Sequence, residues 1–178
     1  EKIKSIYPGF PEDIVTYLKK EEEKTLTEDE KELAMSINAI APKMFAQELS
    51  QTGGKLLQLS TDFVFDGEQN FPYKTDQKKK PLGVYGATKA AGEDAIYDVL
   101  GNCNQALIIR TSWLTGDVGK NFMKTMIRLH RSQEEIRVVS DQFGCPTYSK
   151  DLVDCTLNII DSNKFNKHKV YNFSNEGF

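Results

Sequence analysis

Histidine and cysteine are both scarce in this sequence. The 178 residues include two histidines and three cysteines, and none of them has the spacing of a metal-binding set, so we expect no zinc site. An odd number of cysteines is also more typical of reduced thiols in a cytoplasmic protein than of a disulfide framework. We therefore expect a cytoplasmic protein whose fold needs neither metal nor disulfides.

Long apolar runs and a strong net charge are missing too. No stretch approaches the ~20 apolar residues that span a bilayer, and no charged-then-apolar leader opens the sequence, so we expect neither membrane insertion nor secretion. The formal net charge of -3 gives no field that would attract nucleic acid. With 39% hydrophobic residues, the chain has enough apolar side chains for the core of one domain.

Apolar residues recur in patterns that predict alternating helices and strands. From Leu33 onward they fall three and four positions apart, which is typical of a helix, until Gly53 stops it. Short unbroken apolar runs predict buried strands. The expected strands are residues 55–60, 106–110, 136–139 and 169–173, and further helices are expected at 85–100, 121–130 and 151–160. This alternation indicates an α/β fold with a mostly parallel sheet, in which ligands bind beyond the carboxyl ends of strands.

Two polar stretches interrupt the pattern. Residues 18–32 are almost all charged or polar, which favours either a solvated helix or a disordered linker. Thr27 followed by Glu30 has the spacing of a capping box that opens the next helix. Residues 66–81 are polar and contain glycine and proline, so they are expected to form a loop.

A Tyr-x-x-x-Lys pair begins the helix at 85–100. The spacing places Tyr85 and Lys89 on one helical face. A free tyrosine has a pKa of about 10, and a nearby ammonium lowers the pKa of a phenol, so such a tyrosine can protonate a ketone. Alone, the pair also occurs by chance on solvated helices. Its context is more specific, because Ser60 and Thr61 fall at the end of a buried strand, where a hydroxyl can donate to a substrate carbonyl or close a turn.

A wider set of motifs resembles one family. The motifs are Ser60-Thr-Asp-Phe-Val-Phe-Asp-Gly67, Tyr85-Gly-Ala-Thr-Lys-Ala-Ala-Gly-Glu93, Arg110-Thr-Ser-Trp113, Asn121-Phe122 and Asp141-Gln-Phe-Gly-Cys-Pro-Thr147. In this order they resemble the dTDP-4-dehydrorhamnose reductases of the extended short-chain dehydrogenase/reductase family. The resemblance implies a Rossmann-type parallel sheet flanked by helices. It also implies part of a smaller substrate-binding lobe, at about 113–150 and at the C-terminal end of the 178 residues.

The resemblance also implies an activity and a catalytic triad. The activity is NADPH-dependent reduction of a 4-keto sugar nucleotide to dTDP-rhamnose, for polysaccharide biosynthesis. Thr61 is expected to hold the substrate carbonyl and Tyr85 to protonate it. Lys89 is expected to stabilise the phenolate and to bind the nicotinamide ribose. Ser60 is expected on the cofactor side of the triad, and Asp62 on the substrate side.

Further positions are implied to contact the substrate, each with an ordinary structural alternative. Trp113 either lines the sugar pocket or is a half-buried core aromatic. Asn121 either faces the nucleotide or caps its helix. The loop at 141–147 either belongs to the substrate side or is a turn between strand and helix. For Arg110, a structural role is expected rather than a phosphate contact.

The sequence also departs from the family pattern. Phe63 stands where the family usually has a second tyrosine, and Gly83 stands where it often has asparagine. The glycine-rich loop that binds the pyrophosphate at a helix N-terminus is absent. We therefore expect the chain to be a fragment of a longer protein. The sequence leaves open NADH in place of NADPH, a Mg²⁺ ion at a subunit interface and a homodimer.

Two alternative functions remain at this point. A nucleotide-sugar epimerase or dehydratase would share Thr61, Tyr85 and Lys89, although a dehydratase usually adds an acidic pair beside the threonine, where this chain has Asp62 and Phe63. The regulatory subunit of methionine adenosyltransferase also resembles these reductases and would be a non-catalytic partner protein. The Ser-Thr-Asp and Arg-Thr-Ser-Trp stretches favour the reductase.

Overall fold

A three-stranded parallel sheet forms the centre of the fold. In the computed structural model, which describes residues 26–102, 104–136, 138, 142, 144–162 and 169–176, the strands are β1 (Leu56–Thr61), β2 (Ala106–Thr111) and β5 (Val170–Phe173). They are hydrogen-bonded in the order β1-β2-β5, and Thr61 pairs with Thr111 at the carboxyl ends. The predicted parallel α/β architecture and three of the four predicted strands are confirmed.

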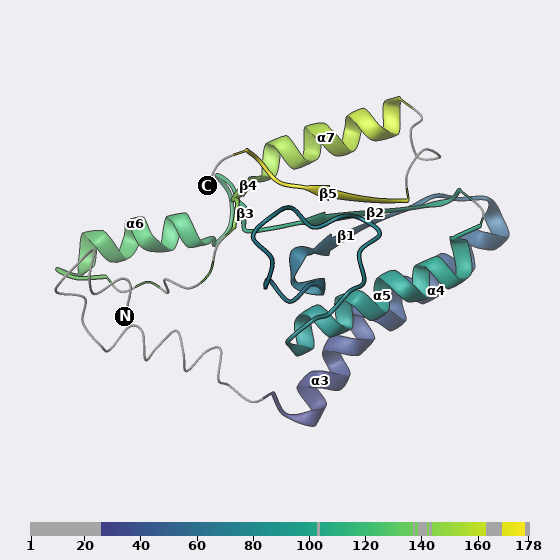
Figure 1. Cartoon of the computed structure of the whole chain (residues 1–178), viewed down its shortest axis with the longest axis horizontal. Helices are drawn as coiled ribbons and strands as arrows, with labels where there is room; N and C mark the ends of the chain where they lie inside the picture. Colours follow the sequence, from purple (N-terminus) through teal and green to yellow (C-terminus); the bar gives the residue numbers. More distant parts are fainter. Residues whose placement is uncertain are drawn as a thin grey trace.

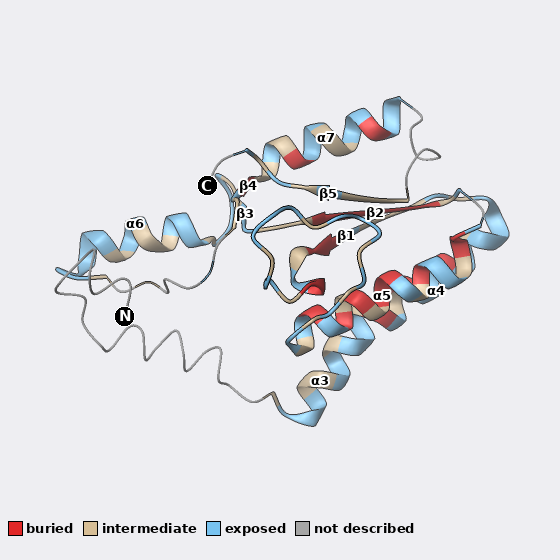
Figure 2. Cartoon of the chain, in the orientation of Figure 1, coloured by how far each residue is buried: buried red, intermediate tan, exposed pale blue. Residues whose placement is uncertain are grey.

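Helices cover both faces of this sheet (Figure 1). On one side lie α4 (Ala41–Thr52) and α5 (Val84–Leu100), and on the other lies α7 (Ser149–Asp161). Because successive side chains of a strand point to opposite faces, β2 contributes to two separate apolar clusters. Leu107 and Ile109 pack on α7, whereas Ala106 packs on α4 and α5. The buried residues of β2 and of the helix faces turned toward it appear in red in Figure 2.

The helix that leads into α4 begins earlier than the apolar pattern predicts. Thr27 and Glu30 form the expected capping box and open α3 (Glu28–Met35). A π-helical segment, η1 (Ser36–Ile40), then joins α3 to α4, which ends at Gly53 with a left-handed φ of 72°. The solvated-helix alternative therefore holds for residues 28–32, and residues 18–25 lie outside the described residues.

Two further elements lie beyond the carboxyl end of β2. The short strands β3 (Leu114–Thr115) and β4 (Thr147–Tyr148) form a separate parallel pair, which the sequence analysis did not predict. Helix α6 (Phe122–Ser132) confirms the helix expected from residue 121. The strand expected at 136–139 is not confirmed, since Ile136 and Val138 are in no strand and the other two residues lie outside the described part. None of the helices within the described ranges is long and apolar enough to cross a membrane.

Helix α5 approaches the π-helical segment η1 closely at Gly92. A Cβ atom at this position would lie 2.0 Å from the carbonyl oxygen of Asn38. The side-chain amide of Asn38 also donates to the Thr88 hydroxyl at 3.0 Å. This hydrogen bond holds η1 and α5 in a fixed position along each other. Only a residue without a side chain allows this backbone contact.

We predict that Gly92→Ala destabilises the fold by about 2 kcal/mol, because the added methyl group must push the two backbones apart. Urea unfolding of the variant and the wild type measures this difference. Gly83→Ala is the matched control, since a Cβ there meets nothing within 4 Å, and it should cost a few tenths of that amount. Equal unfolding midpoints for both variants would contradict the close contact.

Candidate active site

The candidate site begins where β1 ends. Ser60 and Thr61 are buried there, and the chain turns at once into a short 3-10 helix, η2 (Asp62–Val64). The Thr61 hydroxyl accepts a hydrogen bond from the Phe63 amide at 3.2 Å and donates to the Asp62 carboxylate at 3.1 Å. Burial raises the pKa of Asp62, although hydrogen bonds from Thr61 and from the backbone oppose the rise. Thr61 therefore closes the turn after β1, which is the alternative role expected for it.

The first two turns of α5 bring Tyr85 and Lys89 to the same strand end. The Tyr85 ring meets the Phe63 ring edge-on, with centroids 6.0 Å apart and an interplanar angle of 69°. The Lys89 ammonium donates to the Leu59 carbonyl at 2.7 Å. Leu59 and Phe63, which flank Thr61 two residues away on either side, thus contact both members of the Tyr-x-x-x-Lys pair.

Phe63 and Gly86 fix how closely α5 approaches this turn. A Cβ at Gly86 would lie 2.1 Å from the Phe63 carbonyl oxygen. Phe63 has no hydroxyl to offer a substrate, as the sequence indicates, but its ring supports the exposed Tyr85 ring. Phe63 differs from the tyrosine that the family usually has here, but it still makes an aromatic contact with Tyr85.

Behind the triad lies a buried ionic network that the sequence analysis missed. Glu93 is 3% exposed and Arg110 is 5% exposed, and they form a bidentate pair, with Nε–Oε1 at 2.9 Å and Nη2–Oε2 at 2.7 Å. Ser60 donates to Glu93 Oε1 at 2.5 Å, and the Lys79 ammonium lies 3.4 Å from Oε2. The structural role expected for Arg110 is confirmed. The available signal was that Glu93 follows Lys89 by one helical turn.

The charges in this network oppose the effect of burial. Burial alone raises the pKa of Glu93, but hydrogen bonds from Arg110 and Ser60, with the charges of Arg110 and Lys79, hold it below its ordinary value. For Lys89, burial lowers the pKa and the Glu93 charge acts against this. Glu93 is therefore an ionised carboxylate, and its charge reaches the lysine of the triad.

Trp113 and Asn121 lie beyond the neighbouring strand. Trp113 has a left-handed φ of 41°, and its ring lies 6.4 Å from the Phe122 ring. It follows Thr111, the strand partner of Thr61, by two residues, so it belongs to the same sheet edge. Asn121 caps α6 by accepting from the Lys124 amide at 3.0 Å, and its amide donates to the Gly116 carbonyl at 2.7 Å. The contacts of Asn121 are therefore those of a helix N-cap, the structural alternative expected for it.

The loop expected at 141–147 is only partly described. Asp141 and Phe143 lie outside the described residues. The described part packs beneath Trp113, because a Cβ at Gly144 would lie 3.0 Å from the Trp113 ring. The Ser112 hydroxyl also donates to the Cys145 carbonyl at 2.8 Å. This end of the loop is thus attached to the segment that follows β2.

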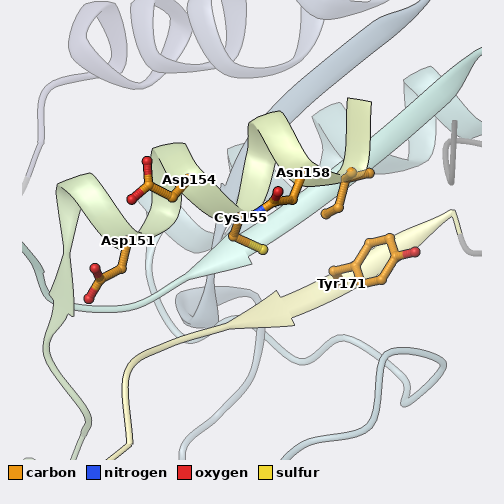
Figure 3. A pocket seen from close by; sticks show the side chains of 6 residues that line it. Asp151, Asp154, Cys155, Asn158 and Tyr171 are labelled. Atoms are coloured by element: carbon orange, nitrogen blue, oxygen red, sulfur yellow. The ribbon is translucent and has the colours of Figure 1, made fainter. Parts of the chain in front are cut away.

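A separate pocket of about 510 Å³ opens on the other face of the sheet (Figure 3). It lies between α7 and β5 and is lined by Asp151, Asp154, Cys155, Asn158, Ile159 and Tyr171. None of the triad residues lines it. Over the described ranges, no group of three histidine, cysteine or acidic side chains is placed to hold a metal ion.

With this geometry in view, the family comparison is decisive. The model of the RmlD substrate binding domain matches residues 6–178. The chain belongs to the RmlD substrate binding domain family. It is 42% identical over 133 residues to the dTDP-4-dehydrorhamnose reductase of Salmonella typhimurium, covering 75% of this chain and 44% of that protein. It is 46% identical over 127 residues to the Streptomyces griseus protein of that name, covering 71% and 41%.

A solved structure of the family shares the fold. It is the dTDP-4-dehydrorhamnose reductase of Bacillus anthracis in complex with NADP, with a TM-score of 0.77 and 41% identity over 84% of this chain and 51% of that one. This RmlD-family chain therefore has a Rossmann-type α/β fold. A UDP-galactose 4-epimerase structure, 23% identical with a TM-score of 0.68, shares the fold alone. The chain spans about half the length of the curated relatives it matches.

We predict that Arg110→Met destabilises the protein by about 3–5 kcal/mol, because it leaves the Glu93 carboxylate buried without its main partner. The double variant Arg110→Met/Glu93→Leu should recover most of this loss, since an apolar pair needs no counter-charge. Urea unfolding of wild type, both single variants and the double variant forms the cycle. Strictly additive losses would show that the two side chains do not interact.

The pair should also weaken in acid. The pKa of Glu93 is held below its ordinary value in the folded protein, so the stabilisation is fully present above the unfolded glutamate pKa of about 4.3 and is lost as the pH falls through the folded value. The difference in unfolding free energy between wild type and Arg110→Met should therefore shrink toward low pH. A constant difference from neutral pH to well below the unfolded glutamate pKa would contradict an ionised Glu93.

Proposed function

We propose that the protein containing this chain is an NADPH-dependent dTDP-4-dehydrorhamnose reductase. It would reduce the 4-keto group of dTDP-4-dehydrorhamnose to give dTDP-rhamnose, for polysaccharide biosynthesis. The observation that carries this proposal is that Lys89 contacts Leu59 and Tyr85 contacts Phe63, the residues two before and two after Thr61 at the carboxyl end of β1. The names of its 42% and 46% identical relatives support the same substrate and reaction.

The proton is the part of the reaction that this chain's own residues supply. The Thr61 hydroxyl now donates to Asp62, and a rotation about its Cβ–Oγ bond turns that hydrogen toward a substrate carbonyl. Tyr85 is 53% exposed at the turn, so its phenol can reach the same oxygen and give it a proton. The resulting phenolate lies one helical turn from the Lys89 ammonium, which stabilises it. The ketone thereby becomes an alcohol once a hydride has reached its carbon.

The cofactor side fits the donors that are present. NADPH, when bound, supplies the hydride. The Lys89 ammonium has three hydrogens and the Leu59 carbonyl takes one, so the other two remain for hydroxyl groups such as those of the nicotinamide ribose. We assign Ser60 to this side as well, because it follows Leu59 on β1. The Bacillus anthracis relative that shares the fold was solved with NADP, which supports NADPH over NADH for this chain.

The substrate side is assigned to residues after β1 and β2. We assign Asp62, Phe63, Trp113 and Asn121 to it, with the elements at about 113–150 forming part of a smaller substrate-binding lobe. Two features support this assignment. β3 and β4 form a sheet of their own, separate from the central one. Trp113 has a backbone conformation that is rare for a bulky residue, and such strain is most often kept at functional positions.

Turnover by the complete protein tests the proposal. NADPH absorbance is followed with dTDP-4-dehydrorhamnose as substrate, and the product is identified as dTDP-rhamnose. Oxidation that depends on the sugar nucleotide supports the reductase. NADPH binding without oxidation would instead favour a non-catalytic partner subunit. Interconversion of sugar epimers without net oxidation would favour an epimerase.

Tyr85→Phe is predicted to lower kcat by about 10²–10⁴-fold, because it removes the proton donor and little else. Tyr97→Phe is the matched control: it lies on the same helix and is equally exposed at 53%, and its activity should equal that of wild type. Steady-state kinetics with circular dichroism of each variant makes the comparison. Near-normal turnover by Tyr85→Phe would remove Tyr85 from the mechanism.

Lys89→Met is predicted to raise the Kd for NADPH about tenfold and to lower kcat as well, because one charge-assisted hydrogen bond is lost. Lys150→Met serves as control, since Lys150 pairs with Asp154 on α7, on the opposite face of the sheet. Fluorescence titration gives the Kd and the NADPH assay gives kcat. If both lysine variants bind NADPH like wild type, Lys89 does not contact the cofactor.

A further inference from the structure

Helix α5 turns three chemically different side chains toward the end of β1. Tyr85, Lys89 and Glu93 follow one another at intervals of one helical turn. The proposed reaction uses the first two. We propose that Glu93 is a positioning residue of the same site, which anchors the end of β1 to α5 and sets the charge beside Lys89; this inference rests on the proposed reductase function.

The anchoring follows from two adjacent hydrogen bonds. Ser60 donates to Glu93 Oε1 at 2.5 Å, and Lys89 donates to the Leu59 carbonyl at 2.7 Å. Consecutive residues of β1 are thus held by consecutive turns of α5. Thr61 is the next residue along the strand, so its hydroxyl keeps its place relative to Tyr85 only while both hydrogen bonds hold.

Glu93 can act as an anchor because its own position is over-determined. Arg110 on β2 binds both of its oxygens, at 2.9 and 2.7 Å, and Lys79 lies 3.4 Å away. Arg110 is held in turn by the Thr75 carbonyl at 3.2 Å and by the Phe65 ring, whose centroid lies 5.0 Å from its guanidinium carbon. Because β2 and the loop before α5 both hold the carboxylate, the Glu93 side chain is kept in one rotamer. The hydrogen bond from Ser60 to this fixed carboxylate then fixes the Ser60 side chain as well.

The charge effect can be separated from the anchoring. The charged groups around Glu93 are Arg110 from β2, Lys79 from the loop before α5, and Lys89 on its own helix. The Glu93 charge raises the pKa of Lys89 against the lowering by burial. Lys89 therefore keeps its proton to higher pH while Glu93 is ionised. Replacing Glu93 with a neutral residue removes this support.

Glu93→Gln tests both effects at once in the complete protein, because glutamine keeps the shape but loses the charge and one of the two acceptor oxygens that Arg110 clamps. We expect kcat to fall on the order of tenfold or more, since small misplacements in an active site are costly. We also expect the basic limb of the kcat/KM–pH profile to move to lower pH, because Lys89 then loses its proton sooner. Ser60→Ala removes the anchor but leaves the charge, so it should lower kcat without moving the limb.

Tyr73→Phe controls for mere loss of stability. Tyr73 stacks on Phe65 and donates to Asp66 at 2.7 Å, so the variant disturbs the same packed region without touching Glu93. Its pH profile should match that of wild type. The inference is overturned if Glu93→Gln has the wild-type basic limb, or if Tyr73→Phe shifts the limb equally. Should Glu93→Gln fail to fold, an unchanged kcat in Ser60→Ala overturns the anchor by itself. Absence of wild-type turnover rejects the reductase proposal, and this inference falls with it.

Discussion

The buried pair of Glu93 and Arg110 is the constraint on which the arrangement of the site depends. Removing two charges from water is costly, and the cost is offset only when the geometry is good and the remaining hydrogen bonds are made. Here both guanidinium bonds are short, and Ser60 and Lys79 complete the environment of the carboxylate. Because the pair joins α5 to β2 in the core, it prevents α5 from sliding along its own axis over the sheet.

That axial position determines what the exposed residues of α5 can do. Tyr85 and Lys89 reach the end of β1 only because Gly86 lets the helix approach the Phe63 carbonyl, while Gly92 lets it approach η1 on another side. The helix is therefore fixed by close backbone contacts at Gly86 and Gly92 and by the ionic contact of Glu93, the residue after Gly92. A site whose members lie on a helix and an adjacent strand end gains its precision from such packing rather than from contacts among the reacting groups.

The elements with local signals were predictable from sequence. Unbroken apolar runs mark β1 and β2 because both faces of a parallel sheet are buried, and the Thr27 capping box marks α3 because it involves residues three positions apart. The approach of Tyr85 and Lys89 to the end of β1 was predictable because the two residues share one face of a helix. The Glu93–Arg110 pair and the β3–β4 pairing are contacts between segments far apart in the sequence, and the π turn at Ser36–Ile40 lies against α5, another distant segment. No local pattern of residues encodes them, and Trp113 likewise has a backbone conformation that its neighbours in sequence do not signal.

The π-helical segment ties one contact of α5 to the length of the chain before α4. A π turn accommodates one more residue than an α turn, and each residue of an α-helix advances the chain by about 100° around the axis. A one-residue deletion that restored regular α-helix at Ser36–Ile40 would not rotate α3 against α4 by that angle, because the π turn absorbs its extra residue locally. It would still carry Asn38 away from Thr88 and Gly92. The number of residues in this stretch is therefore matched to the contact between Asn38 and α5.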